Sequence, residues 1–470
     1  MPQKLSNLVY NIKNQITHMQ SFIKKLSCSI LLAAMFLPGT AQNKPAYEMK
    51  INGVKVIVQP SGNEIVDVIT VFKGGVQNYP ADKAGIESLA IDALTECGTK
   101  KDSKNSFKDK LDKVSAEIGG SAGMDFSSVT LNCIKSDLGQ VWPLYVDAIT
   151  IPLFDTAEFS RIKQDAISNL KSQASRPDFA ISKFAKETAF KGKDYAKSPT
   201  GEESTVSSLT ASETSKYYSS ILTRSRMVII VVAELEKSDI EKMVKALTQN
   251  IPEGVEVKLN RYSYSPVKNT FAEQNKAVAT NYIQGVTGAP QPGTSDFNAF
   301  VIAMRIFYNR QFLEVRTNNG LSYAPQTRFN PGLSPYTTIQ VTTTNPDKYI
   351  GVMDELLVKT HSLGFTPEEV KNTKTGYVTS FYSQMETNGA QAASLANNEI
   401  LFNDWRRSLR INEDMKKVSL DDVNKAFNKY VKDITWVYQG DTSKVNPLLY
   451  TANPADKKLP DSKISNGTKN

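Results

Sequence analysis

The sequence predicts an α+β protein made of two homologous-looking α/β sandwich domains of about 200 residues each. Three observations support this prediction. The chain has 470 residues, of which 40% are hydrophobic and 22% are charged, so it can bury more than one core. Strand-like and helix-like patterns occur in the same order in both halves, and a polar segment at 251–276 separates the halves.

The elements of the first half follow from the spacing of its apolar residues. Short apolar runs, alternating or continuous, predict strands at 47–59, 64–73, 121–126, 128–134 and 227–233. Apolar residues that recur every three or four positions predict helices at 86–97, 107–118, 138–149, 155–174, 182–190 and 237–249. Gly98 closes the first of these helices, and Gly119 with Gly120 closes the second.

The second half repeats this order. We expect strands at 277–285, 321–329, 336–344 and 434–439, and helices at 296–315, 346–360, after Pro367, and at 420–430. The predicted organisation is an N-terminal region at 1–41, a first domain at 42–252, a linker at 253–276, a second domain at 277–448 and a polar tail at 449–470.

The N-terminal region has the order of a secretory signal peptide. Met19 is followed by lysines, then by an apolar stretch at 26–36, then by small residues that end at Ala41. We therefore expect residues 1–18 to be an over-long start, cleavage to follow Ala41, and the mature chain to be periplasmic. The alternative is a buried core helix. Cys28 precedes the apolar stretch, which argues against a lipoprotein signal.

Composition argues against several classes of function. Removal of the signal would leave His361 as the only histidine, so a site built on histidine ligands or a histidine base is not expected. The formal charge of +8 is spread without a basic stripe or a nucleic-acid motif, so no nucleic-acid partner is expected. No apolar run in the body approaches the roughly 18 residues that span a membrane. Cys97 and Cys133 could form one disulfide or remain two buried thiols.

The helix at 86–97 carries a recognisable pattern. Gly85, Leu94, Gly98 and Thr99 follow the segment 72–75, which reads Phe-Lys-Gly-Gly. This spacing resembles the insulinase, pitrilysin and mitochondrial processing peptidase family of zinc metallopeptidases, whose first helix reads G-L-A-H-x-x-E-H-M-x-F-x-G-T. The resemblance, to the bacterial two-domain type, covers essentially the whole mature chain. It implies paired domains that form half of a clamshell-like chamber.

The zinc motif of that family is missing from this helix. In the family, two histidines on one helix face bind Zn²⁺, and the glutamate between them is the general base. Counted from the glycine that opens the motif, the histidine positions hold Ser88 and Asp92, and the glutamate position holds Ile91. Counted back from the threonine that ends it, the three positions hold Leu89, Asp92 and Ala93. Neither register contains a histidine.

The third zinc ligand of the family is a glutamate on a later helix, and here the matching segment at 161–170 has Asn169 in its place. The resemblance therefore implies that Ser88, Ile91, Asp92 and Asn169 occupy a lost metal site and that this chain binds no cofactor. Glu87, Asp92 and Glu96 form an acidic cluster, which we interpret as a solvated helix face.

One family motif remains in the second half. The segment 316–323 reads Arg-Thr-Asn-Asn-Gly-Leu-Ser-Tyr, which resembles the family signature R-E-x-x-G-L-x-Y. The resemblance implies that Arg316 and Tyr323 bind the carbonyl of the scissile peptide bond. Both side chains can donate a hydrogen bond to that carbonyl and to the oxyanion formed from it. We expect Arg316 at a helix end and Tyr323 on the strand that follows. The alternative is a helix-capping cation and a core aromatic.

Three functions are compatible with this pattern. In the first, the chain is the non-catalytic subunit of a heterodimeric zinc metallopeptidase, inactive alone, that supplies Arg316 and Tyr323 while a zinc-bearing family member supplies Zn²⁺ and the base. In the second, it is a non-enzymatic scaffold or peptide-binding protein of the same fold. In the third, it is an enzyme with unconventional ligands such as Asp92 and Glu96. The two retained side chains favour the first, with a peptide as substrate.

Overall fold

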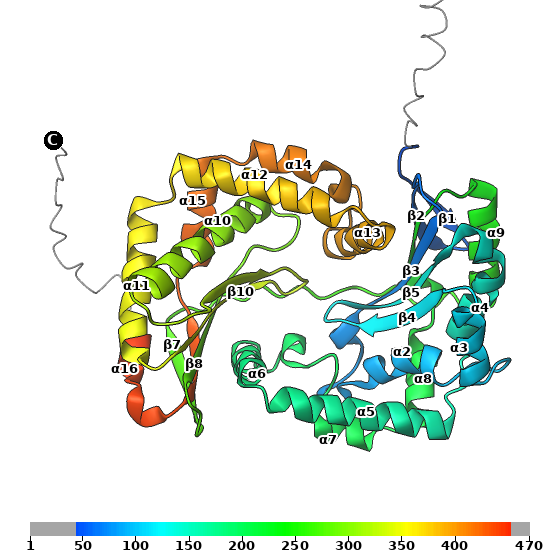
Figure 1. Ribbon diagram of the computed structural model, residues 1–470, viewed down its shortest axis with the longest axis horizontal. Helices are drawn as coiled ribbons and strands as arrows, with labels where there is room; N and C mark the ends of the chain where they lie inside the picture. Colours follow the sequence, from blue (N-terminus) through cyan, green and yellow to red (C-terminus); the bar gives the residue numbers. More distant parts are fainter. Residues whose placement is uncertain (1–43, 453–470) are drawn as a thin grey trace, which may run out of the picture. The chain divides into compact units, whose positions relative to one another are not determined.

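The computed structural model describes residues 44–452, so the predicted signal region and most of the predicted polar tail lie outside the described residues. From Ala46 on, the described chain forms one compact unit with two β-sheets and helices packed on them, shown in Figure 1. The predicted α+β class is confirmed. Among the described residues, no helix combines the length and the apolar character needed to cross a bilayer.

The first sheet has six strands in the order β1-β2-β6-β3-β5-β4. Only β2 and β6 run parallel, and the other neighbours are antiparallel. Segments rich in valine and isoleucine form the central strands because β-branched side chains pack well on a pleated surface. The strands are β1 (Tyr47–Ile51), β2 (Val54–Gln59), β3 (Ile65–Lys73), β4 (Glu117–Ala122), β5 (Phe126–Ile134) and β6 (Met227–Val232).

The second sheet has five strands in the order β7-β11-β8-β10-β9, and again only one neighbouring pair, β7 and β11, is parallel. This order matches β2-β6-β3-β5-β4 strand for strand, so the two halves repeat one topology. The strands are β7 (Thr270–Asn275), β8 (Asn281–Thr287), β9 (Gln326–Asn330), β10 (Tyr336–Thr343) and β11 (Thr435–Gly440). Strand β7 lies inside the segment at 253–276 that we expected to be a linker.

The helices also recur in matching order. Those of the first half are α2 (Ile86–Glu96), α3 (Lys104–Asp112), α4 (Leu138–Thr150), α5 (Thr156–Ala174), α6 (Pro177–Ala189), α7 (Glu203–Ser208), α8 (Ala211–Ile221) and α9 (Lys237–Thr248). Those of the second half are α10 (Asp296–Gln311), a π-helical segment η6 (Phe312–Asn318), α11 (Pro346–Leu363), α12 (Pro367–Gln384), α13 (Asn388–Phe402), α14 (Arg407–Lys417), α15 (Leu420–Tyr430) and α16 (Pro447–Thr451).

The predicted helix at 107–118 is wrong in its second half. Helix α3 ends at Asp112, and Ser115 adopts a positive φ of 49°. Ile118 then lies in strand β4 and pairs with Leu131 of β5. The apolar spacing at the end of this segment therefore belongs to a strand, because pairing with β5 outweighs the local helical pattern.

Each half packs one of its helices on the sheet of the other half. Helix α6 of the first half packs against β8 and β11 of the second sheet, and α13 of the second half packs against β3 and β6 of the first (Figure 1). In the second contact, Ala392, Leu395 and Ala396 of α13 share a core with buried residues of the first sheet. Strand β3, with both faces covered, is accordingly buried along nearly its whole length.

Candidate functional site

Two glycines fix the ends of helix α2. Gly85, the N-cap, has a φ of 94°, and a Cβ placed on it would lie 2.8 Å from Cγ2 of Val206. Gly98, just after the helix, has a φ of 76°, and its Cβ would lie 2.7 Å from the carbonyl oxygen of Asp102. A side chain at either position would be strained by the backbone and would collide with its neighbours. The glycine frame of the family motif therefore has a structural cause that does not depend on a metal.

A cavity of about 320 Å³ lies between α2 and α5, and three of the four residues assigned to the lost metal site line it: Ser88, Asp92 and Asn169. The fourth, Ile91, is not among the lining residues and is fully buried. A Cβ on Gly120 of β4 would lie 2.3 Å from Cγ2 of Ile91, so this side chain packs closely against the edge strand.

The residues at this cavity do not fit zinc. Ser88, Asp92 and Asn169 offer a hydroxyl, a carboxylate and an amide, whereas zinc sites in proteins use histidine, cysteine and carboxylate ligands. The other two carboxylates of the cavity, Glu96 and Asp165, are both paired with Arg161. Within residues 44–452 no group of three or more His, Cys, Asp or Glu side chains has the arrangement of a metal site. The structure therefore supports no metal-dependent step at this cavity.

The pKa values of Asp92 and Glu96, two acidic residues of the cavity, are shifted in opposite directions. Burial raises the pKa of Asp92 to about 6, and the nearby Glu96 carboxylate adds to this rise. Burial also acts to raise the pKa of Glu96, but hydrogen bonds from Lys108 and Arg161 and the charge of Lys104 outweigh it and lower the pKa. Nη2 of Arg161 lies 2.8 Å from Oε2 of Glu96, which joins α5 to α2 across the cavity.

The interpretation of Glu87 as part of a solvated face is wrong. Only 1% of this residue is exposed, and its carboxylate accepts hydrogen bonds from Nδ2 of Asn78, at 3.0 Å, and from the hydroxyl of Tyr217. Burial raises the pKa of Glu87 despite these hydrogen bonds. The buried face of the helix is therefore wider than the apolar residues alone predicted, because it also includes a buried acid.

The structure places Arg316 and Tyr323 side by side. The guanidinium carbon of Arg316 lies 5.9 Å from the ring centroid of Tyr323 and 4.9 Å from that of Phe312. Tyr323 is 86% exposed, which rules out the alternative of a core aromatic. Neither residue is among those that line the cavity between α2 and α5.

The local structure around this pair differs from the prediction. Arg316 lies in the π-helical segment η6 that continues α10, and Gly320 has a φ of 60° and turns the chain. Tyr323 precedes strand β9, which begins only at Gln326, so it lies on a loop. π-helical segments are rare and occur often at functional sites.

The two cysteines of the described chain are both free and buried, Cys97 at the end of α2 and Cys133 in β5. His361 lies in the last turn of α11, where Nδ1 is 2.8 Å from Oδ1 of Asn428 and the ring packs on Phe427.

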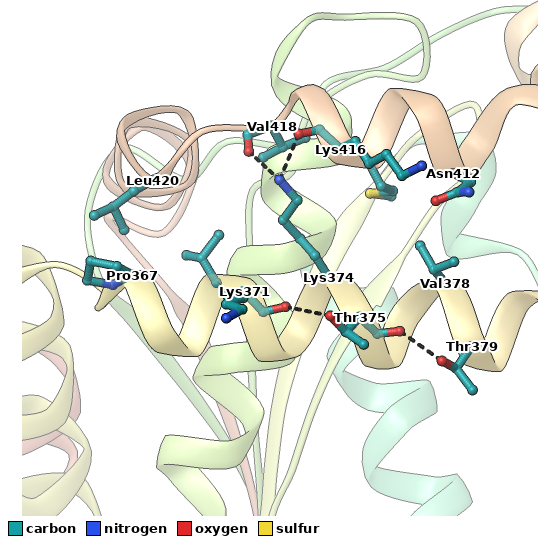
Figure 2. A pocket seen from close by; sticks show the side chains of 12 residues that line it. Pro367, Lys371, Lys374, Thr375, Val378, Thr379, Asn412, Lys416, Val418 and Leu420 are labelled. Atoms are coloured by element: carbon teal, nitrogen blue, oxygen red, sulfur yellow. Dashed lines mark hydrogen bonds between the residues drawn. The ribbon is translucent and has the colours of Figure 1, made fainter.

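A second cavity, of about 540 Å³, was not predicted from the sequence. Helices α12, α14 and α15 surround it, and Figure 2 shows the residues that line it. Nζ of Lys374 reaches across from α12 and donates hydrogen bonds of 2.9 Å and 2.8 Å to the carbonyl oxygens of Lys416 and Val418 at the end of α14 (Figure 2). In the first half, Nζ of Lys163 on α5 donates in the same way to the carbonyl oxygens of Ser207 and Leu209 at the end of α7. The repeated contact gives Lys374 a structural role.

Comparison with known proteins gives one family match. The model of the peptidase M16 inactive domain matches residues 208–377, a range that includes η6 and the Arg316 and Tyr323 positions. No curated protein matches the sequence.

Several solved structures share the fold. The peptidase M16 inactive domain from Pseudomonas fluorescens has a TM-score of 0.77 at 17% identity and covers 86% of this chain and 100% of its own. A protease from Helicobacter pylori has a TM-score of 0.76 at 16% identity, with 84% of this chain and 99% of its own covered. The periplasmic protease PqqL from Escherichia coli has a TM-score of 0.73 at 14% identity, with 85% of this chain but only 47% of its own covered.

Proposed function

We propose that this chain, as a member of the peptidase M16 family that lacks the zinc motif, is the non-catalytic subunit of a heterodimeric metallopeptidase. In this assembly the chain supplies Arg316 and Tyr323, and a zinc-bearing family member supplies the metal and the base. The chain alone does not hydrolyse peptides.

The observation that carries this proposal is the exposed pair in the second half. Tyr323 is 86% exposed and lies beside the Arg316 guanidinium. Within residues 44–452, no carboxylate or hydrogen-bond acceptor occupies that guanidinium. Because most of the Tyr323 side chain is exposed and lies beside the Arg316 guanidinium, both groups are open to a ligand.

The chemistry of the pair suits a peptide carbonyl. The guanidinium offers several fixed N–H donors and the phenol offers one O–H donor. Both can donate to the carbonyl oxygen of the bound peptide, and both interactions strengthen as negative charge develops on that oxygen. Because Arg316 stacks on Phe312, its orientation is partly fixed before the peptide binds.

The test is co-expression with a zinc-bearing family member from the same genome. We expect the pair to cleave a quenched fluorescent peptide and this chain alone to be inactive without stoichiometric zinc. Arg316→Ala and Tyr323→Phe should each lower kcat/KM of the pair by roughly 10- to 1000-fold, the range for loss of one oxyanion donor. Arg316→Lys, which keeps the charge but not the planar fork, should recover only part of the loss.

The matched control is Arg176→Ala, since Arg176 is an exposed arginine of the first half. Assembly of each variant with the partner is measured by size-exclusion chromatography. An active pair whose turnover is unchanged by Arg316→Ala would refute the role of the pair. Zinc binding and peptide cleavage by the chain alone would refute the non-catalytic role. A chain that forms no active pair with the family member would favour the scaffold or peptide-binding alternative.

We also propose that the protein works in the periplasm, as the signal-like N-terminal sequence predicts and as the name of the Escherichia coli relative describes for that protein. Cell fractionation and N-terminal sequencing of the mature chain test this, with Gln42 as the expected first residue. An intact N-terminus in the cytoplasmic fraction would contradict it.

A further inference from the structure

Two rows of polar side chains face each other across the cavity between α2 and α5. Ser88, Asp92 and Glu96 line the cavity and lie four residues apart on α2, so they project from one side of that helix. The lining residues on α5 have the same spacing, and they include Arg161, Asp165, Asn169 and Gln173. The 2.8 Å contact between Nη2 of Arg161 and Oε2 of Glu96 joins the two rows at one end.

The charges are neutralised only at that end. Arg161 pairs with Glu96 and also with Asp165, whose Oδ2 lies 2.9 Å from Nη1. Asp92 lines the same cavity, yet within residues 44–452 its carboxylate accepts no hydrogen bond and forms no salt bridge. Burial and the Glu96 charge raise the pKa of Asp92, and no basic group opposes this rise. The cavity therefore contains one carboxylate that lacks a counter-charge.

The groups around Asp92 suit a primary ammonium. An ammonium has three N–H donors and no acceptor, so its best partners are a carboxylate and further oxygen acceptors. The Ser88 hydroxyl and the Asn169 amide oxygen line the cavity, and neither side chain makes a hydrogen bond within the described part of the chain. Leu89 and Ile162, which also line it, offer an apolar surface to the alkyl chain that carries the ammonium.

We propose that this cavity binds a primary ammonium on a short alkyl chain, as carried by a lysine side chain or by the amino-terminal residue of a peptide. Asp92 pairs with the ammonium, and Ser88 and Asn169 accept its remaining hydrogen bonds. The volume of about 320 Å³ suits a single side chain. That the ligand is part of a peptide rests on the proposed function, whereas the preference for an ammonium follows from the carboxylate without a counter-charge.

The test is isothermal titration calorimetry on the purified chain without a partner, at pH 7 and low salt. Nα-acetyl-lysine methylamide presents the side-chain ammonium, and leucine methylamide presents a free amino terminus. Nα-acetyl-norleucine methylamide keeps the alkyl chain without a charge and is the matched neutral probe. We expect an ammonium probe to bind about tenfold more tightly than the neutral probe, as one charge-assisted hydrogen bond allows. The tighter of the two ammonium probes identifies the source, and the difference should shrink as salt is raised.

Three variants assign the binding to Asp92. Asp92→Asn keeps the shape of the side chain and removes its charge, so it should bind the charged and neutral probes equally weakly. Asp165→Asn removes a carboxylate of the same cavity that is already paired with Arg161, and it should keep the preference of the unmodified chain. Ser88→Leu places a larger apolar side chain in the cavity with Asp92 intact, and it should abolish binding. Thermal melting checks that each variant folds.

Equal affinity for the ammonium and neutral probes would overturn the proposal. So would an unchanged preference in Asp92→Asn, full binding by Ser88→Leu, or an equal loss in Asp165→Asn, because the last result would show attraction to negative charge in general. Since the measurement needs neither a partner nor turnover, its failure is distinguishable from a failure of Arg316 and Tyr323 in the active pair.

Discussion

Asp92 has a charge that the folded state disfavours. Its pKa rises from an ordinary 3.8 to about 6, chiefly through burial and then through Glu96. Between these pH values the folded chain binds a proton that the unfolded chain releases. The contribution of Asp92 to stability is therefore full below pH 3.8 and is lost as the pH rises through 6.

We predict that Asp92→Asn stabilises the protein at pH 8 by about 1–3 kcal/mol, because it removes the cost of a partly buried charge. The gain should shrink as the pH falls from 6 toward 4. Urea unfolding at several pH values measures it, and Asp165→Asn, at an exposed carboxylate on the same cavity, serves as the control. A gain that is constant from pH 4 to pH 8 would contradict the assigned cause.

Ile91 and Gly120 depend on each other. Because a Cβ on Gly120 would lie 2.3 Å from Cγ2 of Ile91, Gly120→Ala should destabilise the protein by about 1–3 kcal/mol. Ile91→Ala should cost about 2–5 kcal/mol by leaving a void. In the double variant the new methyl enters that void, so the total loss should be clearly smaller than the sum. Additive losses in denaturant unfolding would show that the two side chains do not meet.

At the scale of single residues, burial was the property that the sequence predicted least well. Ser88 and Asp92 lie four positions apart on α2, Asn169 lies on α5, and all three line one cavity. Glu87 was assigned to the surface because an acid is rarely fully buried, and only the partners Asn78 and Tyr217, distant in sequence, make its burial possible.

Among the elements, the same lysine contact stabilises corresponding helix ends in both halves. Lys374 donates to the last carbonyl groups of α14, and Lys163 to those of α7. These carbonyls have no partner within their own helices, and a cation there also interacts favourably with the helix dipole.

We predict that Lys374→Met lowers the free energy of unfolding by about 1–3 kcal/mol, since it leaves two carbonyl oxygens without their donor while keeping most of the side-chain volume. Lys163→Met should cost somewhat less, because one of its hydrogen bonds is longer, at 3.4 Å. Lys371→Met, at an exposed lysine of the same helix as Lys374, is the control and should be nearly neutral. Chemical denaturation at constant pH gives the three values.

The elements that sequence patterns missed are those stabilised by contacts with residues distant in the sequence. Strand β4 reads partly as helix because its Gly-Gly pair has no strand preference, and pairing with β5 decides its structure. A helix was expected at 182–190, within α6, and α13 lies among the helices expected after Pro367, but periodicity cannot say which sheet an apolar face will cover. A cavity of about 750 Å³ among α10, β9 and α12 was missed for the same reason. A helical spacing of Phe297, Val301, Arg305 and Tyr308 was the available local signal.

In the whole molecule, helices α6 and α13 connect the cores of the two halves, because each packs on the sheet of the other half. Two further contacts between the halves strengthen this connection. Nε1 of Trp405 lies 2.6 Å from Oε2 of Glu48, and the backbone N–H of Leu333 donates to Asp125, 3.3 Å away.

We predict that the two halves unfold as one cooperative unit. In hydrogen exchange followed by mass spectrometry, amides of β3 and β8 should lose protection at the same urea concentration, because opening either sheet exposes the other. Leu395→Ala on α13 should lower the stability reported by both strands equally, by about 2–5 kcal/mol. Leu409→Ala, at an exposed leucine of α14, is the matched control. Separate loss of protection in β3 and β8 would contradict the prediction.

The packing of α6 and α13 on the sheets of the opposite halves also limits how this chain could be shortened. The first half has no metal-binding group among its described residues, yet cutting it away would remove α6 from β8 and β11 and expose an apolar face of that sheet, which favours self-association. The side chains around the first cavity can change with little effect on the fold, whereas the apolar face of α6 cannot. The first half is therefore a physical support for the second, whatever the chemistry of its own cavity.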